Sequence, residues 1–537
     1  MTRIWALLLL CAAAVSLLDQ GARASVLTRP PQEGKAVYLL GDCGARMLAP
    51  GGVGTIAEAD GARWIVEQRG ENTLSLRAFG GRAWLGVRNG GVHISADLAP
   101  EERAWTWQDE GEGRFRLRPA LLGQRALALG PDGAVLTPPG GCETLFSFDQ
   151  FPVHSPGRRT LHVDGEAGGG RSGEDGSAGA PFRSINAAVR SARPGDRILV
   201  HPGEYREAVA FPKALSGKPQ AWVVIESAIT HAAKVIPPPG AAGFELLGDF
   251  VEVHGFEVVN PGDEPCIKID WGSSHQRVME NFAHDCGGGG VTVARSDHTW
   301  IEGNVVARTS FRNPYVMSGI SIWQPRAADR APGPHIVIRR NISYGNENRV
   351  PGKKATDGNG VIIDDTRNKQ MGSKAGPFLF PTLIEDNLVF ANGGSGVRVL
   401  LSDNVTIRRN TSYMNLHRQE DTTWRGEIMN VLSADTLFEN NLAVANTDFH
   451  PQNYALFDSA REVKGRWRGN LAYSWPMEGR TFRQISTAAG PPEGNLLGVR
   501  PEFANPRLDA LADFRMVGQA GASAGVGARM ELLPELR

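Results

Sequence analysis

The segments RRNISYG (339–345), EDNLVFA (385–391) and RRNTSYM (408–414) share one pattern, in which an asparagine opens a short strand-like stretch. The same asparagine stands in MENFAHD, EGNVVAR, ENNLAVA and RGNLAYS. Its seven positions are Asn281, Asn304, Asn341, Asn387, Asn410, Asn441 and Asn470, at spacings of 23, 37, 46, 23, 31 and 29 residues. Self-similarity at such a period predicts a coil of about 23 residues into which loops of variable length are inserted.

A second strand precedes each asparagine strand. These strands are CIKID, GVTVA, GISIW, GVIID, GVRVL, EIMNV and YALFD, and most of them alternate apolar and outward-facing residues. Coils that carry two or more short strands stack with equivalent residues about 4.8 Å apart. The pattern therefore predicts a right-handed single-stranded parallel β-helix in an all-β chain. We expect each asparagine to adopt left-handed backbone angles at a bend and to bond its amide to the next asparagine, which is a structural role.

The segments that flank the coils predict how the stack begins and ends. Ser184 is a candidate N-cap for one helix over Ile185–Ala192. RPEFANPRLDALADFRMVGQAGASAGVGA at the end is expected to close the open stack. Cys266 and Cys286 are 20 residues apart, close to one coil, so we expect a disulfide between adjacent turns, with free thiols as the alternative.

With GAPFRSINAAVRSARPGDRILVHPGEYRE (179–207), these features resemble the pectate-lyase-like superfamily of β-helix proteins. The resemblance covers residues 160–530. It implies the fold and leaves the reaction open, because that fold carries lyases, hydrolases, epimerases and adhesive proteins.

A different repeat occupies the N-terminal part. Trp64, Trp105 and Phe146 are spaced 41 and 41 residues apart, and each unit has a glycine-containing turn before a leucine strand. Three hairpin-rich units of about 40 residues resemble a β-trefoil over residues 34–152. LSLRAFGGRAWLGVRNGGVHISA (74–96) is more similar to fascin-like cross-linkers than to ricin-type lectins. The unit either binds carbohydrate or is a packed accessory domain. We interpret its tryptophans as core residues, and a Cys43–Cys142 disulfide would tie the ends of a closed trefoil.

The composition excludes several functional classes. The 537 residues carry 57 Lys and Arg against 58 Asp and Glu, for a formal net charge of -1, so no basic excess supports nucleic-acid binding. Residues 1–24 show a basic start, an apolar run and Ala22-Arg23-Ala24, which predict a cleaved signal peptide. We expect a secreted or periplasmic monomer with no membrane span after cleavage.

The longest loops predict the functional site. They lie between Asn304 and Asn387, and NENRVPGKKATDGNGVIIDDTRNKQ within them concentrates charges of both signs. If Val361 and Ile363 face the core, Asp364 faces outward, with Asp357 before the strand and Asp365 at the bend. Three converging carboxylates offer the oxygen ligands that suit Ca2+. Bound there, Ca2+ would neutralise a uronate carboxylate and acidify the adjacent proton, which is the chemistry of β-elimination.

Resemblance to calcium-dependent β-helix lyases, loosely to pectate lyase family nine, implies a Lys or Arg as the base. Lys354 is the first candidate and Arg398 the second, followed by Lys353. Arg398 occupies the outward position of Ile362 on a neighbouring coil. The sequence lacks the Asn-Ser-Asp-Asp-Gly context of that family.

Further residues are expected to contact substrate. Trp323 and Gln324 stand one coil before Asp364, where an exposed indole could stack on a sugar ring, and Arg367 lies in the charged loop. Asp297-His298 is a pair that could transfer a proton, although such pairs more often hydrogen-bond a turn.

Two classes of function follow. The first is a polysaccharide lyase that cleaves an acidic, uronate-containing polysaccharide by metal-assisted β-elimination, with an inverting hydrolase as the alternative enzyme. TDGNGVIIDD is similar to the aspartate set of polygalacturonase-type hydrolases, but neither Gly-His-Gly nor Arg-Ile-Lys follows it. The second class is a non-catalytic polysaccharide-binding or matrix protein.

Overall fold

The computed structural model divides the chain into two compact units, Met1–Val153 and His154–Arg537. In the first unit it describes residues 36–41, 47–49, 52–54, 64–70, 73–78, 84–89, 91–111, 114–122, 124–130, 133–138 and 146–150. In the second it describes residues 159–166, 174–484, 494–517, 526–530 and 533–534, apart from 220, 316, 332, 419–424 and 460–464.

The second unit is the predicted right-handed parallel β-helix, built from three parallel sheets. The β13 sheet contains β13 (Arg159–Val163), β14 (Asp196–Val200), β17 (Val223–Ser227), β20 (Val251–His254), β23 (Ser274–Met279), β26 (Asp297–Glu302), β29 (Ile336–Arg339), β32 (Thr382–Glu385), β35 (Val405–Arg408), β38 (Leu437–Glu439) and β41 (Arg466–Arg468). The β15 sheet contains β15 (Gly203–Tyr205), β18 (Ala233–Val235), β21 (Glu257–Val259), β24 (Phe282–His284), β27 (Val305–Ala307), β30 (Ile342–Tyr344), β33 (Leu388–Phe390), β36 (Thr411–Tyr413), β39 (Leu442–Asn446), β42 (Leu471–Trp475) and β44 (Leu496–Leu497). The β16 sheet contains β16 (Val209–Phe211), β19 (Phe244–Leu246), β22 (Ile267–Ile269), β25 (Val291–Ala294), β28 (Ile320–Trp323), β31 (Val361–Asp364), β34 (Val397–Leu400), β37 (Gly426–Val431), β40 (Tyr454–Asp458) and β43 (Phe482–Gln484).

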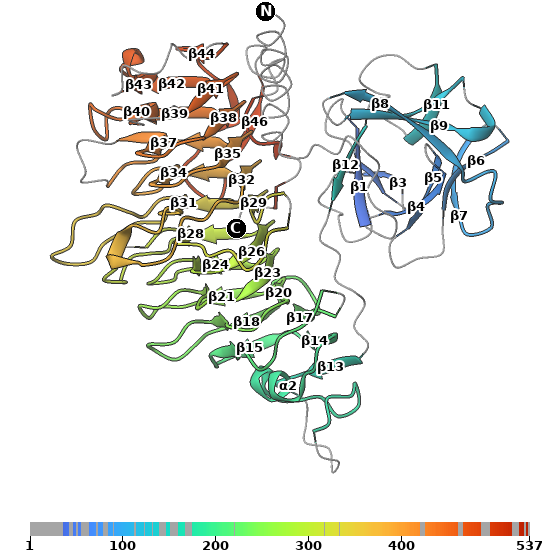
Figure 1. Cartoon of the computed structure of the whole chain (residues 1–537), viewed down its shortest axis with the longest axis horizontal. Coiled ribbons are helices and arrows are strands. Elements are labelled where there is room, and N and C mark those ends of the chain that lie inside the picture. The colour runs from blue at the N-terminus through green and yellow to red at the C-terminus, as the bar shows by residue number, and fades with distance from the viewer. Residues whose placement is uncertain are drawn as a thin grey trace, which may run out of the picture. The chain divides into compact units, whose positions relative to one another are not determined.

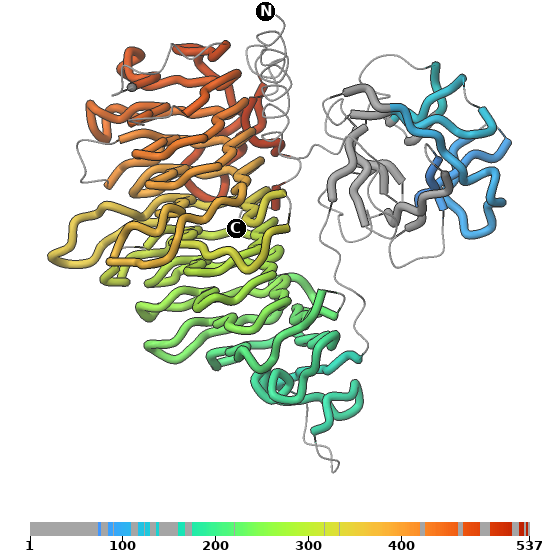
Figure 2. Tube along the Cα trace, viewed as in Figure 1, coloured from blue at the N-terminus to red at the C-terminus, as the bar shows by residue number. Residues whose placement is uncertain are grey.

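From β14 to β43 each coil contributes one strand to each sheet, so successive coils follow one another in chain order along the stack (Figures 1 and 2). The inward positions form one continuous apolar core, to which Ile267, Val291, Ile320, Val361 and Val397 contribute equivalent residues from five neighbouring coils. Alternation along every strand therefore sends the intervening residues to the outer face.

Helix α2 (Ile185–Ser191) lies at the start of the stack, as the sequence predicts. The Ser184 side chain caps it by accepting the backbone N–H of Ala187 at 3.2 Å, and Ile185, Ala188 and Val189 are buried against the first coils. None of the helices in the described part of the chain has the length and apolar character needed to cross a membrane.

The predicted asparagine ladder is confirmed. Each amide Nδ2 donates to the Oδ1 of the next asparagine at 2.9–3.1 Å from Asn281 to Asn470, and Asn495 extends the ladder by one more coil. The prediction of left-handed backbone angles at these asparagines is wrong. The residue before each of them has the positive φ: Glu280, Gly303, Arg340, Asp386, Arg409, Asn440 and Gly469. The bend thereby frees the asparagine side chain to point into the stack.

A second ladder runs parallel to the first and was not predicted. Asn346 donates to Asn392 and Asn392 to Asn415, each at 2.8 Å, and the amide of Asn415 donates to the buried carboxylate of Glu427. Burial raises the pKa of Glu427 to about 7, although the hydrogen bonds from Asn415 and Ser412 oppose this shift. A glutamate thus ends a column of amides inside the stack.

The cysteine prediction is confirmed for the β-helix. Cys266 and Cys286 form a disulfide whose Cα atoms are 5.8 Å apart and which joins two adjacent coils. Cys43 and Cys142 lie outside the described residues.

The C-terminal segment differs from the expectation that it closes the open end. Its strands β45 (Phe503–Asn505) and β46 (Asp513–Met516) pair with each other, and Phe514 and Val526 pack against the outer side of the β15 sheet. Arg529 forms an ion pair with Asp386 at 2.6 Å. The segment covers one side of the stack because that side carries apolar residues such as Tyr344 and Phe390.

The first unit is an antiparallel β domain. Its strands are β1 (Ala36–Gly41), β2 (Met47–Ala49), β3 (Gly52–Gly54), β4 (Trp64–Gly70), β5 (Thr73–Ala78), β6 (Trp84–Arg88), β7 (Gly91–Ser95), β8 (Trp105–Gly111), β9 (Arg114–Pro119), β10 (Ala126–Gly130), β11 (Gly133–Thr137) and β12 (Phe146–Gln150). The three repeat positions Trp64, Trp105 and Phe146 each begin a strand. Trp105 is fully buried and its indole donates to the carbonyl of Leu85, so it is a core residue as predicted.

Candidate functional site

The outer face of the β16 sheet carries the predicted site. Register places Trp323, Asp364 and Leu400 at equivalent positions on three neighbouring coils, and Ile362 beside Arg398. Loops 308–319 and 345–360 precede β28 and β31, and loops 324–335 and 365–381 follow them. These loops, yellow to gold in Figure 1, project beyond the neighbouring coils. The sequence prediction of this geometry is confirmed, since Val361 and Ile363 face the core while Asp364 faces outward.

Two of the three predicted metal ligands, Asp357 and Asp364, lie close enough for their charges to interact. Burial and, next in size, the negative charge of Asp357 together raise the pKa of Asp364 to about 7, while a hydrogen bond from Gln370 and the charge of Arg398 oppose the shift. Burial also raises the pKa of Asp357, against the charge of Arg398 and a hydrogen bond from Asn359. Two carboxylates that share a partly desolvated site disfavour each other's ionised form, and a cation between them would relieve this.

Arg398 supplies positive charge beside both carboxylates. Its side chain is buried, its Nη1 donates to the carbonyl of Thr356 at 2.8 Å, and its Nε has no hydrogen-bond partner. The guanidinium is therefore fixed under the loop that carries Asp357. Its Nε–H has no protein acceptor and is left for a ligand or for ordered water.

Asp365 and Gln324 lie in the bends that follow β31 and β28, and both side chains are buried. The Asp365 carboxylate is fully buried and accepts the backbone N–H groups of Lys369 and Gln370 at 2.8 and 2.6 Å. The amide of Gln324 donates to Asp365 at 2.9 Å and to the carbonyl of Gln370. Both side chains therefore hold the loop that begins at residue 365. The Asp365 carboxylate, expected to bind Ca2+, and the Gln324 amide, expected to bind substrate, are used in these hydrogen bonds.

The remaining predicted residues are distributed over the loops. Lys353 and Lys354 are exposed, and Lys354 stands three residues before Asp357. The carbonyl of Lys354 accepts the backbone N–H of Thr356 at 3.0 Å. Arg367 forms a bidentate pair with Asp403 at 2.8 Å, so its guanidinium is partly occupied. Trp323 is half-buried at the end of β28.

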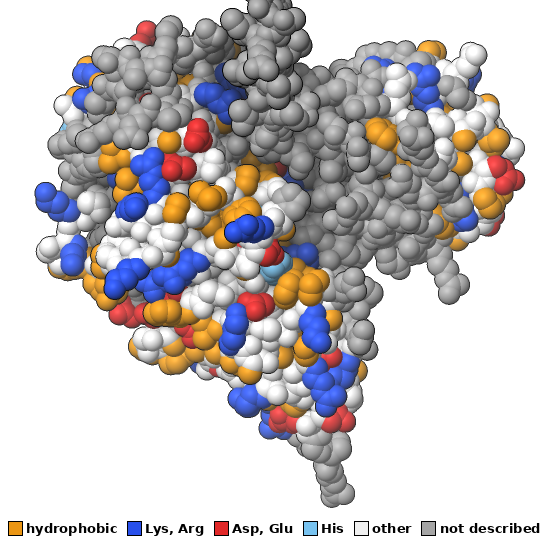
Figure 3. Space-filling model, viewed as in Figure 1, with side chains coloured by type: hydrophobic (Ala, Val, Ile, Leu, Met, Phe, Trp, Pro, Cys, Tyr) orange, Lys and Arg blue, Asp and Glu red, His pale blue; other side chains and the backbone are white. Residues whose placement is uncertain are grey.

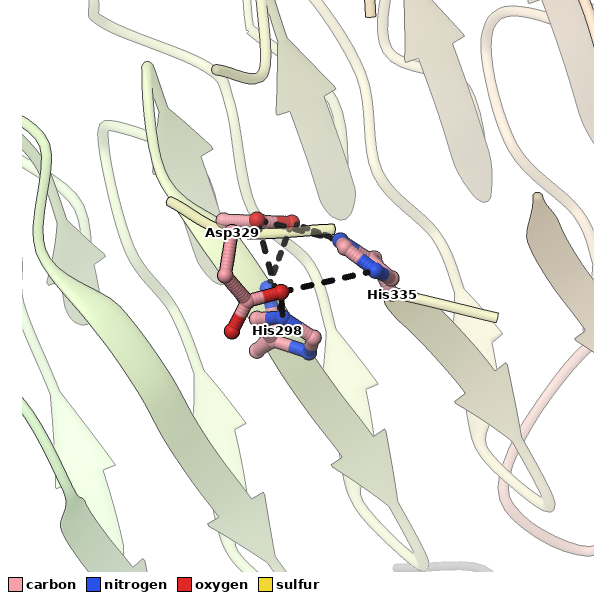
Figure 4. A group of neighbouring side chains, drawn as sticks. His298, Asp329 and His335 are labelled. Carbon is pink, nitrogen blue, oxygen red and sulfur yellow. Dashed lines mark hydrogen bonds and ion pairs between the residues drawn. The ribbon is translucent and has the colours of Figure 1, made fainter. Parts of the chain in front are cut away.

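A second group of ligand-type side chains gathers at the start of β26 and β29. Asp297, His298, Asp329 and His335 offer ligand atoms that all lie within 4.8 Å of one another, which is an arrangement able to hold a metal ion. Among the described residues it is the one such group of three or more. Figure 4 shows the two imidazole rings beside the carboxylate of Asp329. His298 Nε2 is 2.8 Å from Asp329 Oδ1, and His335 Nδ1 is 2.9 Å from Asp297 Oδ1.

The geometry of these four residues is better suited to holding loop 324–335 in place than to coordinating one metal ion. The rings of His298 and His335 stack with centroids 3.8 Å apart, so their in-plane lone pairs point along similar directions rather than converging on one ion. His335 Nε2 contacts the carbonyl of Ala331, and Asp297 accepts the N–H of Ala328. These bonds fasten loop 324–335, which begins directly after Trp323.

The histidines belong to an aromatic column that runs along the β13 sheet. Phe250, His275, His298, His335 and Phe380 stack in that order with centroids 3.8–4.3 Å apart. The sequence interpretation missed His335 and Asp329. A signal was present, because the three histidines each stand six residues before a ladder asparagine: 275 and 281, 298 and 304, 335 and 341.

Asp297→Asn is expected to lower the free energy of unfolding by about 3 kcal/mol, because it removes the carboxylate that is hydrogen-bonded to the buried His335. Burial lowers the pKa of His335, but the hydrogen bonds to Asp297 and Ala331 outweigh this and raise it. Burial raises the pKa of Asp297, and His335 and Ala328 outweigh this and lower it. The raised pKa of His335 stabilises the folded state. This stabilisation is fully present below about pH 6.5 and is lost as pH rises through the raised pKa of His335. The lowered pKa of Asp297 also stabilises the folded state. This stabilisation is present above about pH 3.9 and is lost as pH falls through the lowered pKa of Asp297.

Urea denaturation of both proteins between pH 4 and 8 measures the effect, which should be largest between about pH 4 and 6.5. Asp329→Asn is the matched control, because its side chain is 43% exposed and its loss should stay below about 1 kcal/mol. Equal losses for the two variants would contradict the anchor interpretation.

A family model described as "Protein of unknown function (DUF1565)" matches residues 168–217, which include α2 and the strands β14 to β16. No curated protein matches the sequence.

Several solved structures are similar to parts of the chain. The crystal structure of pectate lyase Pel9A has a TM-score of 0.41 and 16% identity, over 71% of this chain and 90% of that chain. A rhamnogalacturonan lyase has a TM-score of 0.40 and 13% identity, over 69% of this chain and 99% of that chain. ThreeFoil, a designed 3-fold symmetric protein, has a TM-score of 0.20 and 18% identity, over 21% and 96% of the two chains. These similarities assign no activity to this chain.

Proposed function

We propose that this protein is an exported polysaccharide lyase that cleaves an acidic, uronate-containing polysaccharide by β-elimination. The observation that carries the proposal is the meeting of Asp357, Asp364 and Arg398 on the outer face of β31 and β34, between the longest loops of the helix. On the face shown in Figure 3, basic, acidic and apolar side chains are interspersed, so this face presents no continuous basic surface for a nucleic acid.

Asp357 and Asp364 are the residues that would hold Ca2+. Their carboxylates supply hard oxygen ligands, and the mutual destabilisation of their charges is the fit that supports a cation there. Bound Ca2+ would neutralise a uronate carboxylate and acidify the neighbouring C–H group. Arg398, fixed by the carbonyl of Thr356, would bind the same carboxylate and oppose the charge that develops on it.

Lys354 is the proposed base. It is exposed on loop 345–360, three residues before Asp357, and no hydrogen bond or ion pair of its ammonium group is found among the described residues. As a neutral amine it would take the proton from the carbon next to the uronate carboxyl. The electron pair of that C–H bond would form the double bond, and the leaving oxygen would depart with the C–O pair and take a proton from water. Arg398 is the alternative base, and Lys353 is the neighbour best placed to replace Lys354.

Inverting hydrolysis is the second candidate, and one observation favours it. With a pKa of about 7, Asp364 is partly protonated at neutral pH and could protonate a glycosidic oxygen, while Asp357 would activate water as the base. The substrate and the site would be the same.

Incubation of the purified mature chain with a panel of acidic polysaccharides distinguishes these possibilities. We expect ultraviolet absorbance of an unsaturated uronate to rise with Ca2+ present and to stay flat with a chelator. New reducing ends without that absorbance would favour hydrolysis. Neither signal, together with retention of a polymer, would favour a non-catalytic binding or matrix protein.

The proposed location and the role of the first unit rest on sequence. The signal-like residues 1–24 and the Cys266–Cys286 disulfide support a secreted or periplasmic site, where disulfides persist. The antiparallel unit, as a β-trefoil, would help to hold the polymer while the chain acts as a monomer.

A further inference from the structure

The bends that follow β22, β25 and β28 bring together two tryptophans and an arginine. Trp271 follows β22, Arg295 follows β25 and Trp323 ends β28. The guanidinium carbon of Arg295 lies 4.8 Å from the ring centroid of Trp271 and 5.0 Å from that of Trp323. One cation is thus held between two indoles on three consecutive coils, an arrangement that orders a long and flexible side chain.

Arg295 differs from other arginines that lie over tryptophan in this helix. Arg277 lies over Trp222 and also pairs with Glu252, and Arg339 lies over Trp300 and pairs with Glu302. In the described part of the chain no carboxylate forms an ion pair with Arg295, and its Nε is buried with no hydrogen-bond partner. The nearby carboxylate of Asp270 accepts the backbone N–H of Trp271 at 2.7 Å.

The surroundings of Arg295 are suited to an anionic sugar. The Trp271 side chain is 69% exposed, which leaves much of its indole free to stack on a pyranose ring. The planar fork of a guanidinium matches a carboxylate in two parallel hydrogen bonds. A uronate residue is the unit of an acidic polysaccharide that offers both groups.

The site lies in line with the proposed reaction centre. Trp323 is the register partner of Asp364, Ala294 is the partner of Trp323, and Arg295 follows Ala294. Trp271 is therefore three coils, or about 14 Å, from Asp364. A polymer that lies along the helix axis would reach both points at once, so binding at Trp271 would position a remote residue of the chain.

We propose that Trp271, Arg295 and Trp323 form a binding subsite for a uronate residue of the polysaccharide, remote from the cleaved bond. This inference rests on the proposed substrate class and does not require that the chain cleaves it. The carboxylate binds the guanidinium of Arg295, and the sugar ring stacks on Trp271.

Binding to the full mature chain that carries Asp364→Asn tests the subsite without turnover. The probes are a polyuronate and its methyl ester, titrated by calorimetry or by affinity electrophoresis. We expect Arg295→Gln to weaken binding of the free acid at least 10-fold and to leave binding of the ester nearly unchanged. Trp271→Ala should weaken both, and Arg190→Gln, on the exposed end of α2, is the matched control and should weaken neither.

The outcomes separate this inference from the proposed function. If Arg295→Gln binds the free acid as tightly as its parent while the unsubstituted chain eliminates uronate, the subsite is refuted and the lyase stands. If binding of the polyuronate depends on Arg295 but no unsaturated product forms, the subsite is supported and the proposed lyase activity is refuted. If the parent binds no polyuronate, the inference is overturned. With an active chain, Arg295→Gln should lower kcat/KM for long oligouronates and spare the shortest substrates, because only the former reach Trp271.

Discussion

Asp364→Asn is expected to lower kcat/KM for the acidic polysaccharide about 10³-fold, because the amide neither holds a cation nor donates a proton to a leaving oxygen. The β-helix should stay folded, since Asp364 faces outward from a strand whose Val361 and Ile363 fill the core. Initial rates of absorbance or of reducing ends measure the loss, and the thermal midpoint checks the fold. Asp509→Asn, at a half-buried aspartate of the C-terminal segment, is the matched control and should retain full activity.

The pH profile of kcat/KM identifies which chemistry Asp364 serves. Burial and the charge of Asp357 raise its pKa to about 7, so its ionised fraction grows between pH 6 and 8. Elimination needs the ionised form to hold the cation, and its rate should rise over that range. Hydrolysis needs the protonated form as general acid, and its rate should fall. A flat profile, or full activity of Asp364→Asn, would show that the site lies elsewhere.

The fold could be predicted because each coil repeats its own constraints. Asn341, Asn387 and Asn410 occupy one position in three coils, and a buried amide there is satisfied only when another amide stacks on it. That requirement fixes the register of the coils even where 46 residues separate two ladder positions. The left-handed residue escaped prediction because the bend precedes the asparagine and tolerates many residue types, among them Glu280, Arg340 and Asp386.

The site could be predicted only where it lies on strands. Asp364 and Arg398 were placed correctly because strand register transfers from coil to coil. The buried hydrogen bonds of Asp365 and Gln324 could not be predicted, because both residues sit at bends, where φ is positive and the side chain turns into the loop. The partner of Arg367 is Asp403, which lies one coil on, and spacing along the sequence gave no indication of that pair.

Asn387→Ala is expected to lower the free energy of unfolding by about 4 kcal/mol, which is the largest stability effect that we foresee. Its Nδ2 donates to the carbonyl of Ile338 at 3.0 Å and to Asn410 Oδ1 at 2.9 Å, and its Oδ1 accepts two N–H groups of Asn341. Truncation leaves these buried groups without partners in the middle of the stack. Urea denaturation followed by circular dichroism measures the loss.

Asn387→Asp separates hydrogen bonding from packing, because it keeps the volume of the side chain but removes both amide donors. If the ladder stabilises through its hydrogen bonds, the aspartate variant should lose at least as much stability as the alanine variant. A packing role would instead leave it close to the unsubstituted protein. Asn505→Ala, at an exposed asparagine that donates one hydrogen bond to Leu511, is the control and should lose less than about 0.5 kcal/mol. A ladder that contributes this much to the free energy of unfolding would also explain how long loops are tolerated between coils. The stacked coils, and not the loops themselves, hold the register of the strands beneath Asp357 and Asp364.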